Sequence, residues 1–195
     1  CSLRCRTLVY LAALHARRNE SPQQAALQAQ AAELATTSTD ASAELAGAYD
    51  EIGEHANAAR FWKQALADPN TKPERIADAG LSALMAGDTQ RAVELLQKAV
   101  AQNPSNATTQ SNCGIALMTV GSHEPTTSGA GSPAATEALN LAQISVRMTH
   151  EADPSAFDAL GAALAVNGRF AEAAAAANRA DALAAQSAAA AEMRT

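Results

Sequence analysis

The feature that most constrains the fold is a glycine that returns at a fixed interval. Gly53, Gly87 and Gly121 lie 34 residues apart in a chain of 195 residues. Other positions keep the same interval, namely Ala58 and Ala92, Trp62 and Leu96, Ala65 and Ala99, and the pairs Leu45-Ala46, Ala79-Gly80 and Cys113-Gly114. A fixed period of this length is typical of repeat architectures, in which one supersecondary unit is stacked on the next. The chain is therefore predicted to be a repeat protein.

One period reads as two helices joined by a short turn. The stretch Glu74–Pro104 places small and apolar residues at helical spacing on both sides of Gly87-Asp88, and its proline ends the second helix. Hydrophobic residues make up 48% of the chain but aromatics only 3%, and alanine is abundant. Because alanine is the best helix former and lets helices approach closely, the composition favours an all-helical protein.

This helix–turn–helix period resembles the tetratricopeptide repeat (TPR) family. The last hairpin matches the family pattern at Phe157, Leu160-Gly161, Leu164, Gly168, Ala173, Ala177 and Ala180, and the third at Ile76, Ala79-Gly80, Ala83, Gly87, Ala92, Leu96, Ala99 and Pro104. The resemblance covers nearly the whole chain. It implies an all-α, right-handed α-solenoid of about five TPR-like helical hairpins, each packed against its neighbours.

The repeat register divides the chain into three parts. Residues 1–40 form an N-terminal anchor segment and a degenerate hairpin, 41–183 form the TPR solenoid, and 184–195 form a helical or frayed tail. Within the solenoid the predicted units are 41–70, 73–105, 107–153 with an inserted loop at 122–133, and 154–183. The loop SHEPTTSGAGSP is rich in Pro, Gly, Ser and Thr, which is typical of an exposed connection.

Charge is distributed unevenly along the chain. The formal net charge is −6, but residues 1–18 contain four arginines and no acidic residue, so they carry +4 and the remainder carries −10. An acidic body with few aromatic residues argues against nucleic acid as a partner. The basic N-terminal end suits an anionic membrane surface, although a set of solvated arginines is an equally good interpretation.

The chain begins with Cys1 rather than methionine, and Ser2 and a basic stretch follow. This resembles the start of a mature bacterial lipoprotein, in which the cysteine exposed by signal-peptide cleavage becomes lipidated. The resemblance implies a lipid anchor on Cys1 and favours a periplasmic, membrane-anchored protein over a cytoplasmic one. A fragment boundary is the alternative.

Ligands of TPR proteins usually bind the concave surface that the first helices of the hairpins line. Transferred to this chain, the resemblance places a partner-binding groove at Asp50, Ala77, Leu81, Leu84, Ser111, Ile115, Met118 and Asp158. Four of these side chains, Leu81, Leu84, Ile115 and Met118, form an apolar patch suited to a peptide or a helix. Packing between helices is the alternative for each of them. The Lys and Asn set with which some family members clamp a peptide carboxylate is absent.

An enzyme is a poor interpretation of this sequence. It contains no Gly-x-Ser-x-Gly, phosphate-loop or His-Glu-x-x-His motif. His150, Glu151 and Asp153 cluster at a helix end, where capping is a better explanation than metal binding. Cys113 is expected to be a buried apolar filler, and His15 and His55 to be surface residues. We therefore predict no catalytic residue, no metal and no cofactor.

The sequence thus predicts a non-catalytic TPR scaffold that mediates protein–protein interaction. Its tether would be a lipid on Cys1, and its role the assembly or stabilisation of a bacterial envelope or membrane complex. The alternative is a soluble TPR adaptor or a TPR segment of a larger protein. A third hypothesis is an accessory subunit of a membrane complex. The sequence does not identify the partner.

Overall fold

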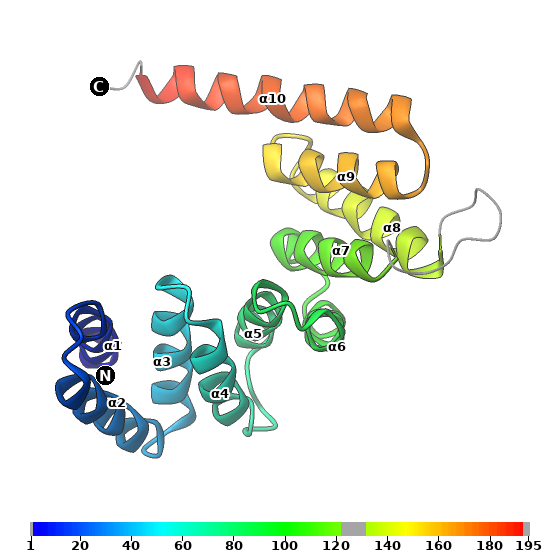
Figure 1. The fold of residues 1–195 in the computed structure, drawn as a ribbon. Helices are drawn as coiled ribbons and strands as arrows, with labels where there is room; N and C mark the ends of the chain where they lie inside the picture. The colour runs from blue at the N-terminus through cyan, green and yellow to red at the C-terminus, as the bar shows by residue number, and fades with distance from the viewer. Residues whose placement is uncertain (1, 122–131, 193–195) are drawn as a thin grey trace. The chain divides into compact units, whose positions relative to one another are not determined.

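The computed structural model describes residues 2–121 and 132–192, and this part of the chain contains ten α-helices and no strand (Figure 1). The helices are α1 (Ser2–Arg17), α2 (Ser21–Ala35), α3 (Thr39–Glu51), α4 (His55–Ala65), α5 (Pro73–Met85), α6 (Thr89–Gln102), α7 (Ala107–Gly121), α8 (Pro133–Met148), α9 (Pro154–Val166) and α10 (Phe170–Glu192). The all-α prediction is confirmed. The predicted anchor Cys1, most of the predicted loop 122–133 and the end of the predicted tail lie outside the described residues.

The chain divides into two compact units. The first, Cys1–Asp88, contains α1 to α5, and the second, Thr89–Thr195, contains α6 to α10. The division falls between the two helices of the predicted hairpin 73–105, so that hairpin, like the other predicted boundaries, stays a prediction.

Within each unit, helices pack in pairs and the pairs stack. In the first unit α3 packs against its partner α4, against α1, the first helix of the preceding pair, and against α5. In the second unit α7 packs against its partner α8 and against α9. First helices therefore contact first helices in both units, which is the arrangement expected of TPR-like hairpins.

Proline and short polar side chains set the starts of several helices. Pro22, Pro73, Pro133 and Pro154 stand in the first turns of α2, α5, α8 and α9, where the missing N–H costs no hydrogen bond. Ser38 caps α3 by accepting a hydrogen bond from the Ala41 backbone N–H at 3.0 Å. Each start matches a break in the sequence pattern, which explains why the helix pairs are visible in the sequence.

The cores combine a few large side chains with many alanines. In the first unit Leu45 and Ile76 are fully buried, and the Tyr49 and Phe61 rings stack with their centroids 5.4 Å apart. In the second unit Leu96 and Cys113 are both 0% exposed. Cys113 is thus the buried filler that the sequence predicted. The small residues let neighbouring backbones approach, so burial is obtained by close helix packing.

The three glycines of the 34-residue period do not share one role. Gly53 and Gly87 follow the ends of α3 and α5 with φ of +77° and +82°, a left-handed conformation that favours glycine. Gly121 is instead the last residue of α7. A Cβ atom placed there would lie 2.8 Å from Ser132 Oγ and 3.0 Å from the Ala135 backbone nitrogen. Glycine at this position therefore permits the close approach of α7 and α8.

We expect Gly121→Ala to destabilise the protein by about 1–3 kcal/mol, the usual cost of overpacking. The added methyl group meets backbone at Ala135, which cannot move alone, and displaces Ser132, whose hydroxyl caps α8. Gly47→Ala in α3 is the matched control, because nothing lies within 4 Å of its added Cβ and alanine favours a helix. Urea titrations followed by circular dichroism measure both. Equal midpoints for the two variants would contradict the role assigned to Gly121.

Candidate functional site

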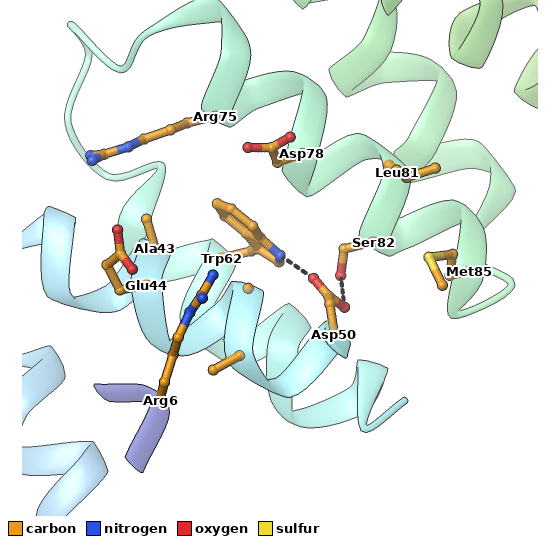
Figure 2. Close-up of a pocket in the computed structure, with 12 residues that line it drawn as sticks. Arg6, Ala43, Glu44, Asp50, Trp62, Arg75, Asp78, Leu81, Ser82 and Met85 are labelled. Carbon is orange, nitrogen blue, oxygen red and sulfur yellow. Dashed lines mark hydrogen bonds between the residues drawn. The ribbon is translucent and has the colours of Figure 1, made fainter. Parts of the chain in front are cut away.

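A pocket of about 330 Å³ opens in the first unit among α1, α3, α4 and α5 (Figure 2). It is lined by Arg6, Ala43, Glu44, Gly47, Ala48, Asp50, Trp62, Arg75, Asp78, Leu81, Ser82 and Met85. The lining combines one indole ring, an apolar patch and several charged groups. This mixture is typical of a binding site with a few orienting polar groups.

Asp50 is the centre of the polar network in the pocket. Its Oδ2 accepts a hydrogen bond from Trp62 Nε1 at 2.8 Å, and its Oδ1 accepts one from Ser82 Oγ at 2.7 Å (Figure 2). The same Oδ1 lies 2.9 Å from Nδ1 of His55. Trp62 and Ser82 are buried and Asp50 is half-buried. One carboxylate on α3 therefore fixes a tryptophan on α4 and a serine on α5, and it holds the indole ring in the pocket.

The two histidines that were expected at the surface are in fact half-buried. The side chain of His55 is 19% exposed and contacts Asp50, and that of His15 is 25% exposed and contacts Glu20 through Nδ1. That expectation was wrong. Each histidine lies five residues from a carboxylate across a helix end, and this local pairing draws the ring against the protein.

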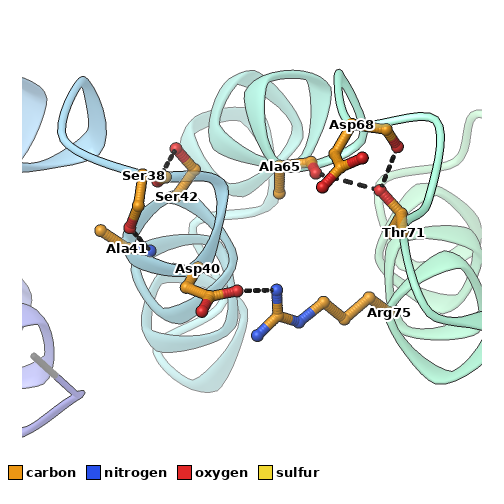
Figure 3. A network of polar contacts seen from close by, with 8 residues as sticks. All are labelled: Ser38, Asp40, Ala41, Ser42, Ala65, Asp68, Thr71 and Arg75. Atoms are coloured by element: carbon orange, nitrogen blue, oxygen red, sulfur yellow. Dashed lines mark hydrogen bonds and ion pairs between the residues drawn. The ribbon is translucent and has the colours of Figure 1, made fainter.

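The arginines of the pocket are held by carboxylates at its rim. Arg6 on α1 donates to Glu51 at 2.9 Å, and Arg75 on α5 forms an ion pair with Asp40 on α3 (Figure 3). The hydrogen bond and charge of Arg75 hold the pKa of the Asp40 carboxyl below its ordinary value. Both arginines thus tie neighbouring helices together and fix the walls of the pocket.

The helix ends that carry this rim are themselves fixed by hydrogen bonds. Near the start of α3, Ser42 Oγ donates to the Ala35 carbonyl at 2.9 Å. In the turn before α5, Thr71 Oγ1 donates to the Asp68 carbonyl at 2.6 Å (Figure 3). These bonds place the backbones from which Asp40 and Arg75 extend, so the wall of the pocket is built before any ligand binds.

Asp78 adds a carboxylate whose charge is disfavoured. Asp78 is exposed, but partial desolvation by its neighbours raises its pKa, and the nearby charge of Glu74 raises it further, while Arg75 opposes both. Beside it, Leu81 and Met85 lie one helical turn apart on α5 and are 36% and 56% exposed. The pocket therefore presents an open apolar patch next to a carboxylate, a surface better suited to an apolar side chain than to an acidic one.

Only some of the predicted groove residues line the pocket. Asp50 and Leu81 both line the pocket, whereas Ala77 is 8% exposed and lies in the core of the first unit. Leu84 is half-buried. In the second unit Ser111 and Met118 are buried, and Ile115 and Asp158 are exposed. The structure thus brings Asp50 and Leu81 together, and the role of the full set in binding stays a prediction.

Several pocket residues were missed by the sequence analysis. Trp62 was assigned only to the repeat pattern, and Arg6 only to a basic end. One signal was present, because Trp62 is the single tryptophan of an aromatic-poor chain. The contacts of Arg6 and Arg75 could not be foreseen, since each pairs with a carboxylate on another helix, more than 30 residues away in the sequence.

The cluster of His150, Glu151 and Asp153 is a helix connection in the structure. Asp153 caps α9 by accepting a hydrogen bond from the Ser155 backbone N–H at 2.9 Å, which confirms the capping interpretation. In the described residues no group of three or more His, Cys, Asp or Glu side chains is placed to hold a metal ion. Among the described helices, none combines the length and the apolar character needed to cross a membrane.

The helix pairs stack through contacts between their first helices, and the pocket opens beside these helices. This arrangement defines a TPR-like all-helical repeat fold. Solved structures of MamA share it. One MamA structure has 15% identity, with 96% of each chain covered and a TM-score of 0.66. MamA AMB-1 has 21% identity over 92% of this chain and 98% of that chain, with a TM-score of 0.66. MamA 41-end from Desulfovibrio magneticus RS-1 has 20% identity over 74% and 75%, with a TM-score of 0.60.

Sequence comparisons give no further assignment. No protein-family model matches the chain, and no curated protein matches it. At identities near one residue in five, the similarity to MamA shows the fold alone. The function must therefore be argued from the pocket and the surface of this chain.

Proposed function

We propose that the protein is a non-catalytic TPR-like scaffold that binds a segment of a protein partner in the pocket of its first unit. The observation that carries the proposal is the pre-formed pocket itself. Asp50 fixes Trp62 inside it, and Leu81 and Met85 remain exposed beside the ring. Exposed apolar side chains next to a fixed aromatic ring offer burial to a partner at little ordering cost.

The chemistry of the pocket favours an apolar anchor on that partner. Trp62, Leu81 and Met85 supply the apolar contact, whereas Asp50 is already engaged by its three neighbours. Asp50 and Asp78 already place two carboxylates in the lining, so a further negative charge is disfavoured there. We therefore expect the partner to insert an aliphatic or aromatic side chain from a peptide or a helix.

We further propose that the protein is tethered to a membrane. A lipid on Cys1 would hold the scaffold at a bacterial membrane, where it would assemble or stabilise an envelope complex. The alternative is a soluble TPR adaptor or a TPR segment of a larger protein. The intact mass of the protein purified from its native source separates the two, because two or three acyl chains on Cys1 support the tether. An unmodified amino terminus would exclude it.

Leu81→Glu together with Met85→Glu should weaken partner binding at least tenfold, because two carboxylates are buried against the apolar anchor without a partner charge. Both side chains are exposed in the free protein, so the circular dichroism spectrum and melting temperature should stay unchanged. Partners are identified as the proteins that the wild-type chain captures from native membrane extract and the double variant does not.

Phe170→Glu is the matched control, because this side chain is 71% exposed and lies outside the pocket. It should leave the captured proteins unchanged. If the double variant retains every protein that the wild type captures, the pocket is not the partner site. If Phe170→Glu loses the same proteins, the loss reflects general surface charge.

A further inference from the structure

Helix α1 carries more exposed large hydrophobic side chains than any other described helix. Leu3 is 81% exposed, and Tyr10, Leu11 and Leu14 are 45%, 40% and 41% exposed. We call these four side chains the α1 stripe. Half of the large hydrophobic residues that are exposed in the described part of the chain belong to this one helix.

The α1 stripe follows from the spacing of its residues. Tyr10, Leu11 and Leu14 lie seven, eight and eleven positions after Leu3, which places all four on one side of an α-helix. The opposite side packs into the first unit through Cys5, Leu8, Val9 and Ala12, all of which are buried. Helix α1 is therefore apolar on two faces, only one of which the protein covers.

Arginines stand at both ends of the α1 stripe. Arg4 lies seven residues before Leu11 and continues the row of that leucine, and Arg18 directly follows the last residue of α1. Arg17 continues the row of Tyr10 in the same way. All three arginines are exposed. Such an arrangement lets apolar side chains enter a lipid surface while the guanidinium groups reach the headgroups.

Two carboxylates that contact α1 are already engaged, and Glu44 on α3 lies near Cys5 and lines the pocket with Arg6. Glu51 on α3 accepts hydrogen bonds from Arg6 and from the Tyr10 hydroxyl, and Glu20 contacts His15. Residues 1–18 carry +4, whereas the rest of the chain carries −10. The segment that carries the exposed apolar stripe is thus net positive, while a partner of the same overall composition as this chain would be acidic.

We infer that the α1 stripe and its flanking arginines bind an anionic lipid surface, with α1 lying in the plane of the headgroups. This deepens the membrane association in the proposed function, but it needs neither a lipid on Cys1 nor the pocket. Apolar insertion and headgroup attraction act together here.

Co-sedimentation with vesicles tests the inference. The full chain carrying Cys1→Ser, which cannot be acylated, is mixed with vesicles of phosphatidylcholine alone or with added phosphatidylglycerol. Binding is expected only to the vesicles that contain phosphatidylglycerol, and it should weaken as salt screens the arginines. Equal binding to both vesicle types, or no binding to either, would overturn the inference.

Charge variants identify the face that binds. Arg4→Gln, Arg17→Gln and Arg18→Gln together should lower the partition coefficient on the order of a hundredfold, at about fivefold for each arginine near an anionic surface. The matched control is Lys63→Gln, Lys98→Gln and Arg147→Gln, which removes the same charge elsewhere. An equal loss in both triple variants would show that only net charge matters, and α1 would then have no particular role.

Leu3→Ser together with Leu14→Ser tests whether the apolar side chains of the α1 stripe bind lipid or a second copy of the chain. Both side chains are exposed, so the fold should be kept, which the circular dichroism spectrum checks. The variant should lose vesicle binding at least tenfold.

Sedimentation velocity of the wild type without vesicles should give a monomer. A dimer that this variant dissociates would assign the stripe to a second copy of the chain and overturn the inference. Capture of partners by the pocket is measured separately and is expected to be unaffected.

Discussion

Asp50→Ala is expected to destabilise the first unit by about 2–6 kcal/mol, because it leaves two buried donors without an acceptor at roughly 1–3 kcal/mol each. Trp62 Nε1 and Ser82 Oγ both donate to this carboxylate, at 2.8 and 2.7 Å, and both side chains are less than a tenth exposed. Fluorescence of Trp62, the single tryptophan, reports the unfolding of this unit during a urea titration.

Two further variants show whether the network or the charge is responsible. Asp50→Asn keeps the shape of the side chain but offers one oxygen where two were used, so its cost should be about 1–2 kcal/mol. Asp40→Ala removes a carboxylate whose ion pair with Arg75 is exposed, and its effect should be far smaller. If Asp40→Ala proves as damaging as Asp50→Ala, the centre of the network has been placed wrongly.

The same experiment bears on binding. Asp50 connects the helices that form the pocket, so Asp50→Asn should also loosen the indole ring and weaken partner capture by a few fold. Substitution of the exposed residues Leu81 and Met85 should have the opposite effect. Partner binding should be lost while the stability of the protein is kept. A pocket held together by one carboxylate-centred network predicts this division between framework and contact residues.

The fold could be predicted because each helix pair repeats local signals. Helix formers, proline in the first turn and glycine after the last turn act within a few residues, so they are readable without the structure. Gly121 shows the limit of this reasoning. It keeps the 34-residue interval of Gly53 and Gly87, yet its reason for being glycine is the approach of α8, which a spacing argument does not contain.

The site was predictable only in part, for a physical reason. Asp50 and Leu81 were expected from the position that they occupy in a first helix, and both line the pocket. The residues that complete it act across helices. Trp62 needs the carboxylate on α3, and Arg75 needs Asp40. Such pairs depend on how neighbouring hairpins rotate against each other. A pattern of apolar positions fixes which face is buried, but not that rotation.

The Cys113 thiol is expected to react with an alkylating reagent on the order of a thousandfold more slowly than an unhindered cysteine at pH 8. The side chain is 0% exposed in α7. Burial first, and the charge of Glu137 second, raise the pKa of Cys113 to about 12, so hardly any of the reactive thiolate is present. Labelling a chain with Cys1→Ser and Cys5→Ala isolates this thiol, and denaturant should restore its full reactivity. Fast labelling of the native protein would contradict its burial.

The same shift makes stability depend on pH in a defined window. In the unfolded chain Cys113 ionises near its ordinary value of 9.0, but in the folded protein it ionises only at about 12. The folded state therefore holds a proton that the unfolded state has lost, and stability falls as pH rises between these values, by about 1.4 kcal/mol per unit. From pH 8 to pH 10.5 the wild type should lose about 2 kcal/mol more than Cys113→Ala, which has no thiol to ionise. Parallel pH profiles for the two proteins would show that the thiol already meets water in the folded state, and that α7 and α8 are less tightly packed than Gly121 indicates.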